Sequence, residues 1–208
     1  MPLLSLLFAL LVILIAVLWL RLRDTEHTLA KERVRDPLTG LFNRQQFLDL
    51  AQREVNRSQR AQKAVSMLLL DVDRMREINR MHGQGGGDLA LQYVASQIRL
   101  SIRDFDLAGR YAGEELALLL PDTSLAGAAI VAERIRKRVA EAGCMVGMHP
   151  VAVSVSIAVC ELRDETQTID DLLLAAEATM ERAHDLGDNL VVLYGEQENG
   201  KGIQTQPL

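Results

Sequence analysis

The stretch that decides the fold is Arg110–Leu116, which reads Arg-Tyr-Ala-Gly-Glu-Glu-Leu. It places two adjacent carboxylates, Glu114 and Glu115, beside a glycine and between the mainly apolar runs 105–108 and 116–120. Because glycine tolerates the backbone angles of a tight turn, this pattern predicts a β-hairpin with acids at its tip. Two acids at such a tip suggest metal binding.

A second acidic pair, Asp71 and Asp73, follows the apolar run 65–70 directly. Such a run ending in acids is typical of a buried central strand that surfaces at its end. Hard oxygen ligands at converging strand ends suit Mg²⁺ and phosphoryl chemistry. The sequence therefore predicts that acids from two neighbouring strands meet.

The other expected elements flank these two strands. The patterns predict helices at 43–61, 74–82, 88–102, 124–142 and 169–183, and further strands at 151–160 and 189–194. The glycine-rich segment 83–87 separates the second helix from the third, which Asp88 is expected to cap. This order predicts an α/β fold with a mixed sheet and helices on its faces. The polar residues 195–208 are expected to form a disordered tail.

Composition limits the function classes. The net charge is -5 and aromatic residues make up 4% of the 208 residues, so neither phosphate neutralisation nor base stacking points to a nucleic-acid polymer as a partner. The length favours one domain with additions. Cys144 and Cys160 fit no metal-binding spacing, so we expect neither a disulfide nor zinc.

Residues 3–20 contain a single polar side chain, Ser5. At ~1.5 Å per residue they span roughly 27 Å, which predicts a single-pass transmembrane helix within 1–20. A cleaved signal peptide is the alternative, but the segment has no basic start and no small-residue cleavage site. Basic residues gather in the segment 21–35 that follows, a predicted helical stalk, so the globular domain is expected in the cytoplasm, beneath the inner membrane.

From Asp36 to Tyr194 the chain resembles the GGDEF family of diguanylate cyclases. The resemblance rests on four motifs in order: Asp-Pro-Leu-Thr-Gly-Leu-Phe-Asn-Arg at 36–44, Asp-Val-Asp at 71–73, Glu-Ile-Asn at 77–79 with Gly83 and Gly87-Asp88, and Ala-Gly-Glu-Glu-Leu at 112–116. It implies a nucleotidyl cyclase palm-like fold for a domain at 36–194. It also implies an enzyme that joins two GTP molecules into cyclic di-GMP, with its catalytic domain in the cytoplasm.

The resemblance implies a metal site and a catalytic group. Asp71 and Glu114 would hold Mg²⁺ or Mn²⁺, with the Val72 carbonyl as a further ligand. Glu114 would help to deprotonate the attacking hydroxyl, with Glu115 beside it.

It also implies the substrate contacts. Asn79 and Asp88 would read the guanine edge, while Arg76 and Gly113 would lie against the nucleotide. Each protomer would bind one GTP, so catalysis would require a homodimer.

A product-inhibition site is implied by Arg103-Asp104-Phe105-Asp106, which fits the RxxD motif of the family. Arg103 would grip a phosphate or a guanine edge of cyclic di-GMP, and Asp106 would accept from guanine nitrogens. Arg134 is expected to supply a further contact from a neighbouring protomer.

Three departures from the family pattern gather at the substrate phosphates. Ala112 replaces the first glycine of the signature, and His184 and Asp188 stand where the family has lysine and arginine. A methyl group near the nucleotide and an acid near a triphosphate are both expected to weaken turnover. The sequence thus favours a membrane-anchored diguanylate cyclase. Two alternatives remain: a degenerate receptor that binds cyclic di-GMP through Arg103 and Asp106, and a purely structural dimerisation module.

Overall fold

The computed structural model describes residues 34–146, 148–163 and 168–195. The chain divides into two units after Val34, and the description below concerns the unit that begins at Arg35. No helix within the described ranges is long and apolar enough to cross a membrane. The predicted membrane helix at 3–20, the stalk up to residue 33 and the tail from residue 196 lie outside the described residues.

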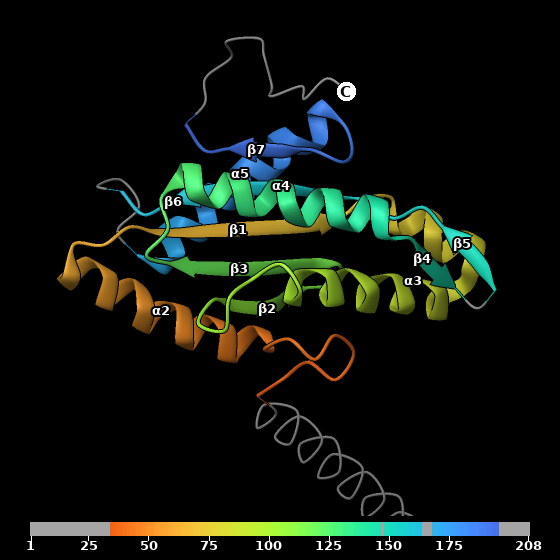
Figure 1. The fold of residues 1–208 in the computed structure, drawn as a ribbon, viewed down its shortest axis with the longest axis horizontal. Coiled ribbons are helices and arrows are strands. Elements are labelled where there is room, and N and C mark those ends of the chain that lie inside the picture. The colour runs from red at the N-terminus through yellow and green to blue at the C-terminus, as the bar shows by residue number, and fades with distance from the viewer. Residues whose placement is uncertain (1–33, 147, 164–167, 196–208) are drawn as a thin grey trace, which may run out of the picture. The chain divides into compact units, whose positions relative to one another are not determined.

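A five-stranded sheet forms the centre of the domain (Figure 1). The strands follow the order β2-β3-β1-β6-β7, with bounds Leu107–Ala112, Glu115–Pro121, Val65–Val72, Val155–Glu161 and Val191–Leu193. Neighbouring strands are antiparallel except β6 and β7, which are parallel. The predicted mixed sheet is therefore confirmed, and β1 and β3 are neighbours at its centre.

Four helices cover the two faces of the sheet: α2 (Arg44–Ala61), α3 (Met75–Arg99), α4 (Leu125–Ala142) and α5 (Ile169–Leu186). In Figure 1, α4 crosses the near face of the sheet and α5 lies behind it. Alternate residues of β1 pack on opposite sides: Leu68 and Leu70 join α3 and α4, whereas Met67 and Leu69 join α2 and α5. The sheet is thus buried on both faces.

Side-chain caps explain where three of the helices begin. Asn43 accepts a hydrogen bond from Gln46 N in α2, and Ser124 accepts one from Gly127 N in α4. Thr168 and Asp171 form a reciprocal capping box at the start of α5.

The glycine-rich segment separates two helices as predicted, but it does so at one residue. Gly83 has non-helical angles, with φ of 70° and ψ of 174°, and it divides α3 into two helices across a kink. The helix resumes through Gly85–Gly87, so Asp88 lies inside α3 and does not cap it. A single left-handed residue is enough for the kink because glycine has no Cβ to strain.

The prediction of one strand at 151–160 is wrong. A hairpin of β4 (Cys144–Val146) and β5 (His149–Val151) comes first, and β6 starts only at Val155. The partner strand changes within this stretch. Val151 pairs with Cys144 of β4, whereas Val155 pairs with Val72 of β1. The pattern therefore reports burial correctly and misses the change of partner strand.

Candidate functional site

The predicted carboxylates meet where β1 and β3 lie side by side. Asp71 is the direct cross-strand partner of Glu115, and Glu114 belongs to the turn that joins β2 to β3. Directly opposite residues of an antiparallel pair project to the same face of the sheet. Gly113 makes this turn with φ of +36°. The structure thus pairs Asp71 with Glu115 and places Glu114 in the adjoining turn, while the metal site itself stays a prediction.

Asp71 and Glu115 both have a raised pKa. Burial raises the pKa of Asp71 above its usual value, and the nearby charges of Glu114 and Asp73 add to this, although His184 opposes it. Burial likewise raises the pKa of Glu115, with Asp71 among the charges that contribute. Half-buried carboxylates that repel one another are stabilised by a bound cation.

One oxygen of Asp71 is available to such a cation, because Oδ1 is buried and has no hydrogen-bond partner. No group of three or more His, Cys, Asp or Glu side chains in the described part of the chain is arranged to hold a metal ion. The predicted set contains two carboxylates and the carbonyl of Val72, the last residue of β1. That set fits Mg²⁺, which proteins commonly bind through one or two carboxylates with substrate phosphates completing the shell.

His184 contacts the same carboxylate. Its Nε2 lies 3.0 Å from Asp71 Oδ2, and the two residues are 113 positions apart in the chain. The sequence predicted only that a phosphate-binding cation is lost at this position. The structure adds that the side chain from α5 is directed to the predicted metal ligand.

Asp73, the second acid of its pair, is buried and acts as a structural anchor. Its carboxylate accepts hydrogen bonds from Ser154 Oγ, Ser156 Oγ (2.6 Å) and the backbone N–H of Asn189 (2.8 Å). Charged acceptors make strong hydrogen bonds. Asp73 therefore ties the segment after α5 to the ends of β1 and β6.

Asp188 is paired with Arg74, since Arg74 Nε lies 2.6 Å from Asp188 Oδ2. The negative charge that was expected to repel a triphosphate thus has a cation next to it. Arg74 is the residue at which α3 begins, and its backbone is left-handed, with φ of 53°.

The hairpin tip is fixed by Arg110. This side chain donates from Nε to the carbonyl of Gly113 (3.0 Å) and forms an ion pair with Asp36 (3.2 Å). Asp36 also accepts hydrogen bonds from the N–H and the hydroxyl of Thr39. The first motif of the domain therefore holds the turn that carries Glu114. Ala112 does not have positive φ, so its methyl group causes no backbone strain.

The predicted guanine-reading pair lies along α3. A Cβ atom on Gly87 would meet the side-chain oxygen of Asn79 at 2.0 Å, so the Asn79 amide rests against the backbone directly before Asp88. Glycine is needed at this close approach. Asn79 and Asp88 are both exposed, as is Arg76 on the first turn of α3.

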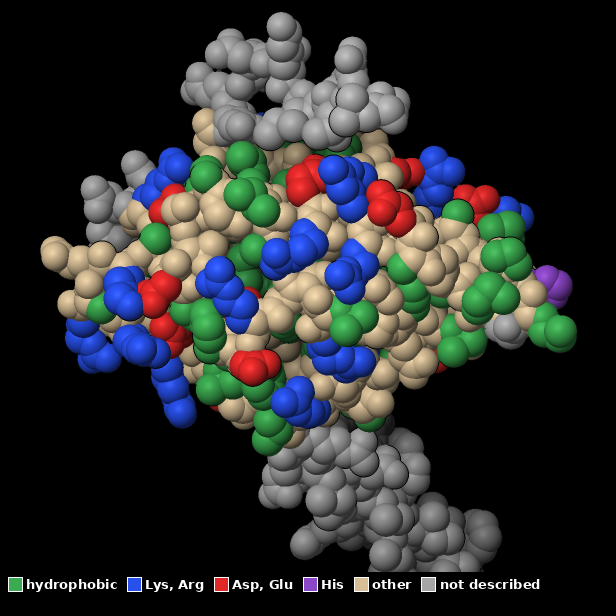
Figure 2. Space-filling model, in the orientation of Figure 1, with side chains coloured by type: hydrophobic (Ala, Val, Ile, Leu, Met, Phe, Trp, Pro, Cys, Tyr) green, Lys and Arg blue, Asp and Glu red, His purple; other side chains and the backbone are tan. Residues whose placement is uncertain are grey.

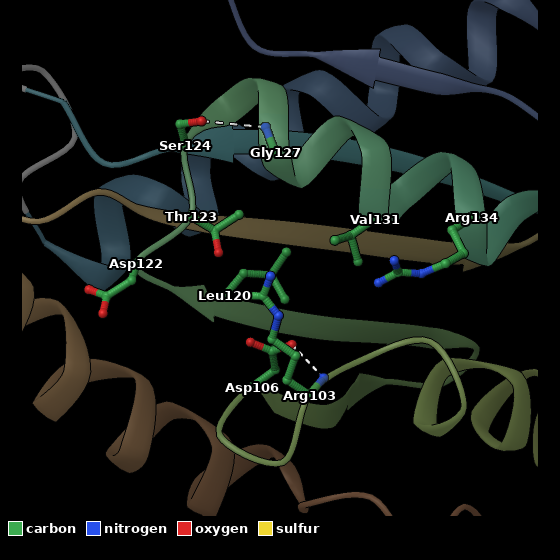
Figure 3. Close-up of a pocket in the computed structure, with 9 residues that line it drawn as sticks. All are labelled: Arg103, Asp106, Leu120, Asp122, Thr123, Ser124, Gly127, Val131 and Arg134. Carbon is green, nitrogen blue, oxygen red and sulfur yellow. Dashed lines mark hydrogen bonds between the residues drawn. The ribbon is translucent and has the colours of Figure 1, made fainter.

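The three residues of the predicted inhibitory site line one pocket of about 210 Å³ (Figure 3). Arg103 and Asp106 come from the loop between α3 and β2, and Arg134 reaches toward that loop from α4. Arg134 was expected to contribute from a neighbouring protomer. Within the chain it lines the same pocket as Arg103, and Arg134 Nη2 donates to Ser101 O. The contact from a neighbouring protomer stays a prediction.

Asp106 is poised to accept hydrogen bonds in this pocket. Its Oδ2 accepts from the N–H of Arg103 (2.7 Å), while its Oδ1 is buried with no partner. Burial raises the pKa of Asp106, although the hydrogen bond from Arg103 and the charges of Arg103 and Arg134 lower it in part. Basic side chains outnumber acidic ones around the middle of the molecular face that Figure 2 shows. The pocket thus combines cations with one unsatisfied acceptor.

Sequence reasoning missed the roles of Arg74, Asp73 and Arg110. Asp73 was visible as the second acid of a pair, but nothing in its neighbours indicates that Ser154 and Ser156 donate hydrogen bonds to it. The partners of Arg74 and Arg110 lie 114 and 74 positions away, so no local spacing links them.

Comparison with known proteins agrees with this geometry. A family model described as diguanylate cyclase, GGDEF domain, matches residues 33–190. The response regulator PleD of Caulobacter vibrioides is 37% identical over 161 residues, covering 76% of this chain and 36% of its own. The diguanylate cyclase DgcM of Escherichia coli is 34% identical over 157 residues, covering 76% of this chain and 37% of its own. The chain thus spans little more than a third of the length of these relatives.

Solved structures match the fold. The diguanylate cyclase SiaD of Pseudomonas aeruginosa, solved with its activator SiaC, has a TM-score of 0.73 and 35% identity, covering 86% of this chain and 68% of its own. The GGDEF domain of DgcB from Caulobacter crescentus, solved in complex with c-di-GMP, has a TM-score of 0.74 and 26% identity, covering 78% of this chain and 93% of its own. This chain belongs to the GGDEF family of diguanylate cyclases.

Proposed function

We propose that this protein is a membrane-anchored diguanylate cyclase that condenses two GTP molecules into cyclic di-GMP and pyrophosphate. The observation that carries the proposal is the pairing of Asp71 with Glu115 across β1 and β3 beside the turn that holds Glu114, where burial and neighbouring carboxylates raise the pKa of Asp71 and of Glu115. Carboxylates gathered in this way suit phosphoryl transfer, in which catalysis consists largely of positioning and charge neutralisation.

Asp71, Glu114 and the Val72 carbonyl would hold a divalent cation, Mg²⁺ or Mn²⁺, which would neutralise charge on the transferred phosphate and the leaving pyrophosphate. Glu114 takes the proton from the 3′-hydroxyl of one GTP. That oxygen then forms a bond to the α-phosphorus of the second GTP, the bond to its β-phosphate breaks, and pyrophosphate leaves. The same step in the opposite direction closes the ring.

The remaining predicted residues position the substrate. Asn79 and Asp88 offer an amide and a carboxylate to the guanine edge from α3, and Arg76 offers a cation on the first turn of the same helix. Gly113 leaves room for the nucleotide at the turn, since no atom lies within 4 Å of the place its Cβ would occupy. Each protomer holds one GTP, so the active form is a homodimer.

The proposal is tested with the purified full-length chain in detergent, incubated with GTP and Mg²⁺. Cyclic di-GMP detected by chromatography, and its disappearance in Glu114→Ala, support the enzyme. A wild-type chain that makes no product at any Mg²⁺ or Mn²⁺ concentration contradicts it.

A second function is favoured by the pocket of Figure 3. Arg103, Asp106 and Arg134 line one cavity, and the unpartnered oxygen of Asp106 suits a guanine N–H. We propose that this pocket binds cyclic di-GMP. It serves as a product-inhibition site if the chain turns over GTP, and as the receptor site if it does not. Tight cyclic di-GMP binding by a chain that forms no product distinguishes the receptor from the enzyme.

The membrane anchor is proposed from the sequence of residues 3–20, and the cytoplasmic location of the domain from the basic residues after it. Cell fractionation tests the anchor. The full-length chain is expected in the inner-membrane fraction and released only by detergent. Recovery in the soluble fraction without detergent would refute the anchor.

A further inference from the structure

The ion pair between Arg74 and Asp188 joins two segments that border the proposed nucleotide site. Arg74 follows Asp71 by three residues and stands at the start of α3. Asp188 follows the end of α5, the helix whose His184 contacts Asp71. Both members of the pair are therefore close to the acids proposed to act on the triphosphate.

Asp188 is held in place from two sides. Its neighbour Asn189 donates its N–H to Asp73 Oδ2 (2.8 Å), and the side chain of Asn189 accepts from Arg136 Nη1 (2.8 Å). Movement of this segment would break the part-buried hydrogen bond to the buried carboxylate of Asp73. Asp188 thus offers Arg74 a fixed carboxylate.

Arg74 uses only part of its guanidinium in this pair. The contact of 2.6 Å is made by Nε, and within the described residues neither Nη atom of Arg74 makes a hydrogen bond. The side chain is 70% exposed. An arginine oriented through one edge can still present two nitrogens to a phosphate.

The backbone at Arg74 favours the same ligand. Arg74 is the N-cap of α3 and makes no side-chain cap, so its guanidinium lies free of the helix end that it begins. The N-terminus of a helix attracts anions through its N–H groups and its dipole. A phosphate at this helix end would therefore lie near both the N–H groups and the guanidinium.

We propose that Arg74 is a specificity-determining residue that contacts the β- or γ-phosphate of GTP, and that Asp188 acts as its positioning residue. This inference rests on the proposed function, because it assumes that the triphosphate lies beside Asp71. The cation that the family resemblance led us to expect at position 188 is supplied from the start of α3. Asp188 then contributes by orienting that cation.

The experiment measures binding without turnover, using the full-length chain in detergent with Mg²⁺. The probes are 3′-deoxy-GTP, which lacks the attacking hydroxyl, and guanosine, which lacks phosphates. Arg74→Gln is expected to weaken 3′-deoxy-GTP binding by about 10-fold or more and to leave guanosine binding unchanged. Arg74→Lys keeps the charge and is expected to lose less. Arg57→Gln is the matched control, because Arg57 is 72% exposed and is paired with Glu54 on α2.

Asp188→Ala completes a double-mutant cycle. If Asp188 positions Arg74, the loss caused by Arg74→Gln is smaller in the Asp188→Ala background than in the wild type. Independent losses overturn the positioning role. Unchanged 3′-deoxy-GTP binding in Arg74→Gln, or an equal loss for guanosine, overturns the phosphate contact.

Product formation is measured separately on the wild-type chain. A chain that binds 3′-deoxy-GTP through Arg74 but forms no cyclic di-GMP upholds this inference and rejects the cyclase. A wild-type chain that does not bind 3′-deoxy-GTP overturns the inference.

Discussion

The ends of β1 and β3 and the pocket between α4 and the Arg103 loop differ in how their charges are balanced. At the strand ends, Asp71 and Glu115 are cross-strand partners and Glu114 lies in the adjoining turn, and like charges add to burial in raising the pKa of Asp71 and Glu115. In the pocket, the charges of Arg103 and Arg134 lower the pKa of Asp106 against the effect of burial. The first site therefore calls for a cation, and the second already contains cations and suits an anion with hydrogen-bond donors.

The two sites also differ in how they are assembled. The acidic site is built from β1, the β2–β3 turn, α3 and the segment after α5. Hydrogen bonds of Asp73 and Arg110 hold the last segment and the turn in place. The pocket comes mainly from one loop and one helix. Changes to the acidic site are thus expected to affect both catalysis and folding, whereas changes to the pocket should affect ligand binding alone.

The largest expected effect is at the acidic site. Glu114→Gln removes the charge and the proton acceptor with little change in shape, and it should lower cyclic di-GMP formation by about 10²- to 10⁴-fold. Chromatography of the reaction mixture measures this loss. Asp49→Asn, an exposed carboxylate on α2, is the control and should keep the wild-type rate. Product formation within ten percent of wild type in Glu114→Gln would remove Glu114 from the mechanism.

Asp73 tests whether the residues that assemble the acidic site also stabilise the fold. Asp73→Ala leaves two buried or half-buried hydroxyls and the Asn189 N–H without their acceptor, so it should lower the free energy of unfolding by about 3 kcal/mol. The free energy of unfolding is measured by urea titration of the full-length chain in detergent, with circular dichroism as the signal. Ser154→Ala removes one of these bonds and should cost about 1 kcal/mol. Equal stability of Asp73→Ala and wild type would show that the anchor is unimportant.

The pocket is tested through its cations. Arg103→Ala should weaken cyclic di-GMP binding by about 10- to 100-fold, because a charge-assisted hydrogen bond is lost. Calorimetry measures the binding, and the unfolding free energy should stay near that of the wild type. Arg57→Ala, which removes an exposed arginine of α2, serves as the control. Undiminished binding in Arg103→Ala means that cyclic di-GMP does not use this pocket.

The smallest effect concerns Asp36, which links the first motif to the hairpin tip through Arg110. Burial raises the pKa of Asp36, but hydrogen bonds from Thr39 and the charge of Arg110 outweigh it, so the pKa lies below its usual 3.8. A lowered carboxyl pKa stabilises the fold above about pH 4, and this contribution is lost as the pH falls through the folded pKa. Asp36→Asn should therefore cost about 1 kcal/mol at pH 6.

The pH dependence supplies the control for this prediction. The difference in unfolding free energy between wild type and Asp36→Asn should shrink when urea titrations are repeated near pH 3. A difference that stays constant from pH 6 to pH 3 would mean that the carboxylate charge of Asp36 does not stabilise the turn.

Local patterns predicted most of the elements because burial leaves a periodic trace. The helix expected at 124–142 is observed at Leu125–Ala142, and the buried strand expected from the apolar run 65–70 is observed at Val65–Val72. The hairpin β4–β5 was missed because its strands are three residues long, too short for a period to show. The helix start expected at Asp88 was wrong because only one glycine of its segment leaves the helical conformation.

The functional residues likewise fall into those that the sequence indicated and those that only the tertiary structure brought together. By itself, the sequence determined the family, the acids at the ends of β1 and β3, and Arg103 and Asp106 of the pocket, because each of these is written in a short contiguous motif. Only the tertiary structure decided that Arg74 pairs with Asp188, that His184 contacts Asp71 and that Asp73 holds Asn189. These contacts join α5 and its following segment to β1 and the start of α3. Their energy depends on distance in space, which residue spacing along the chain does not encode.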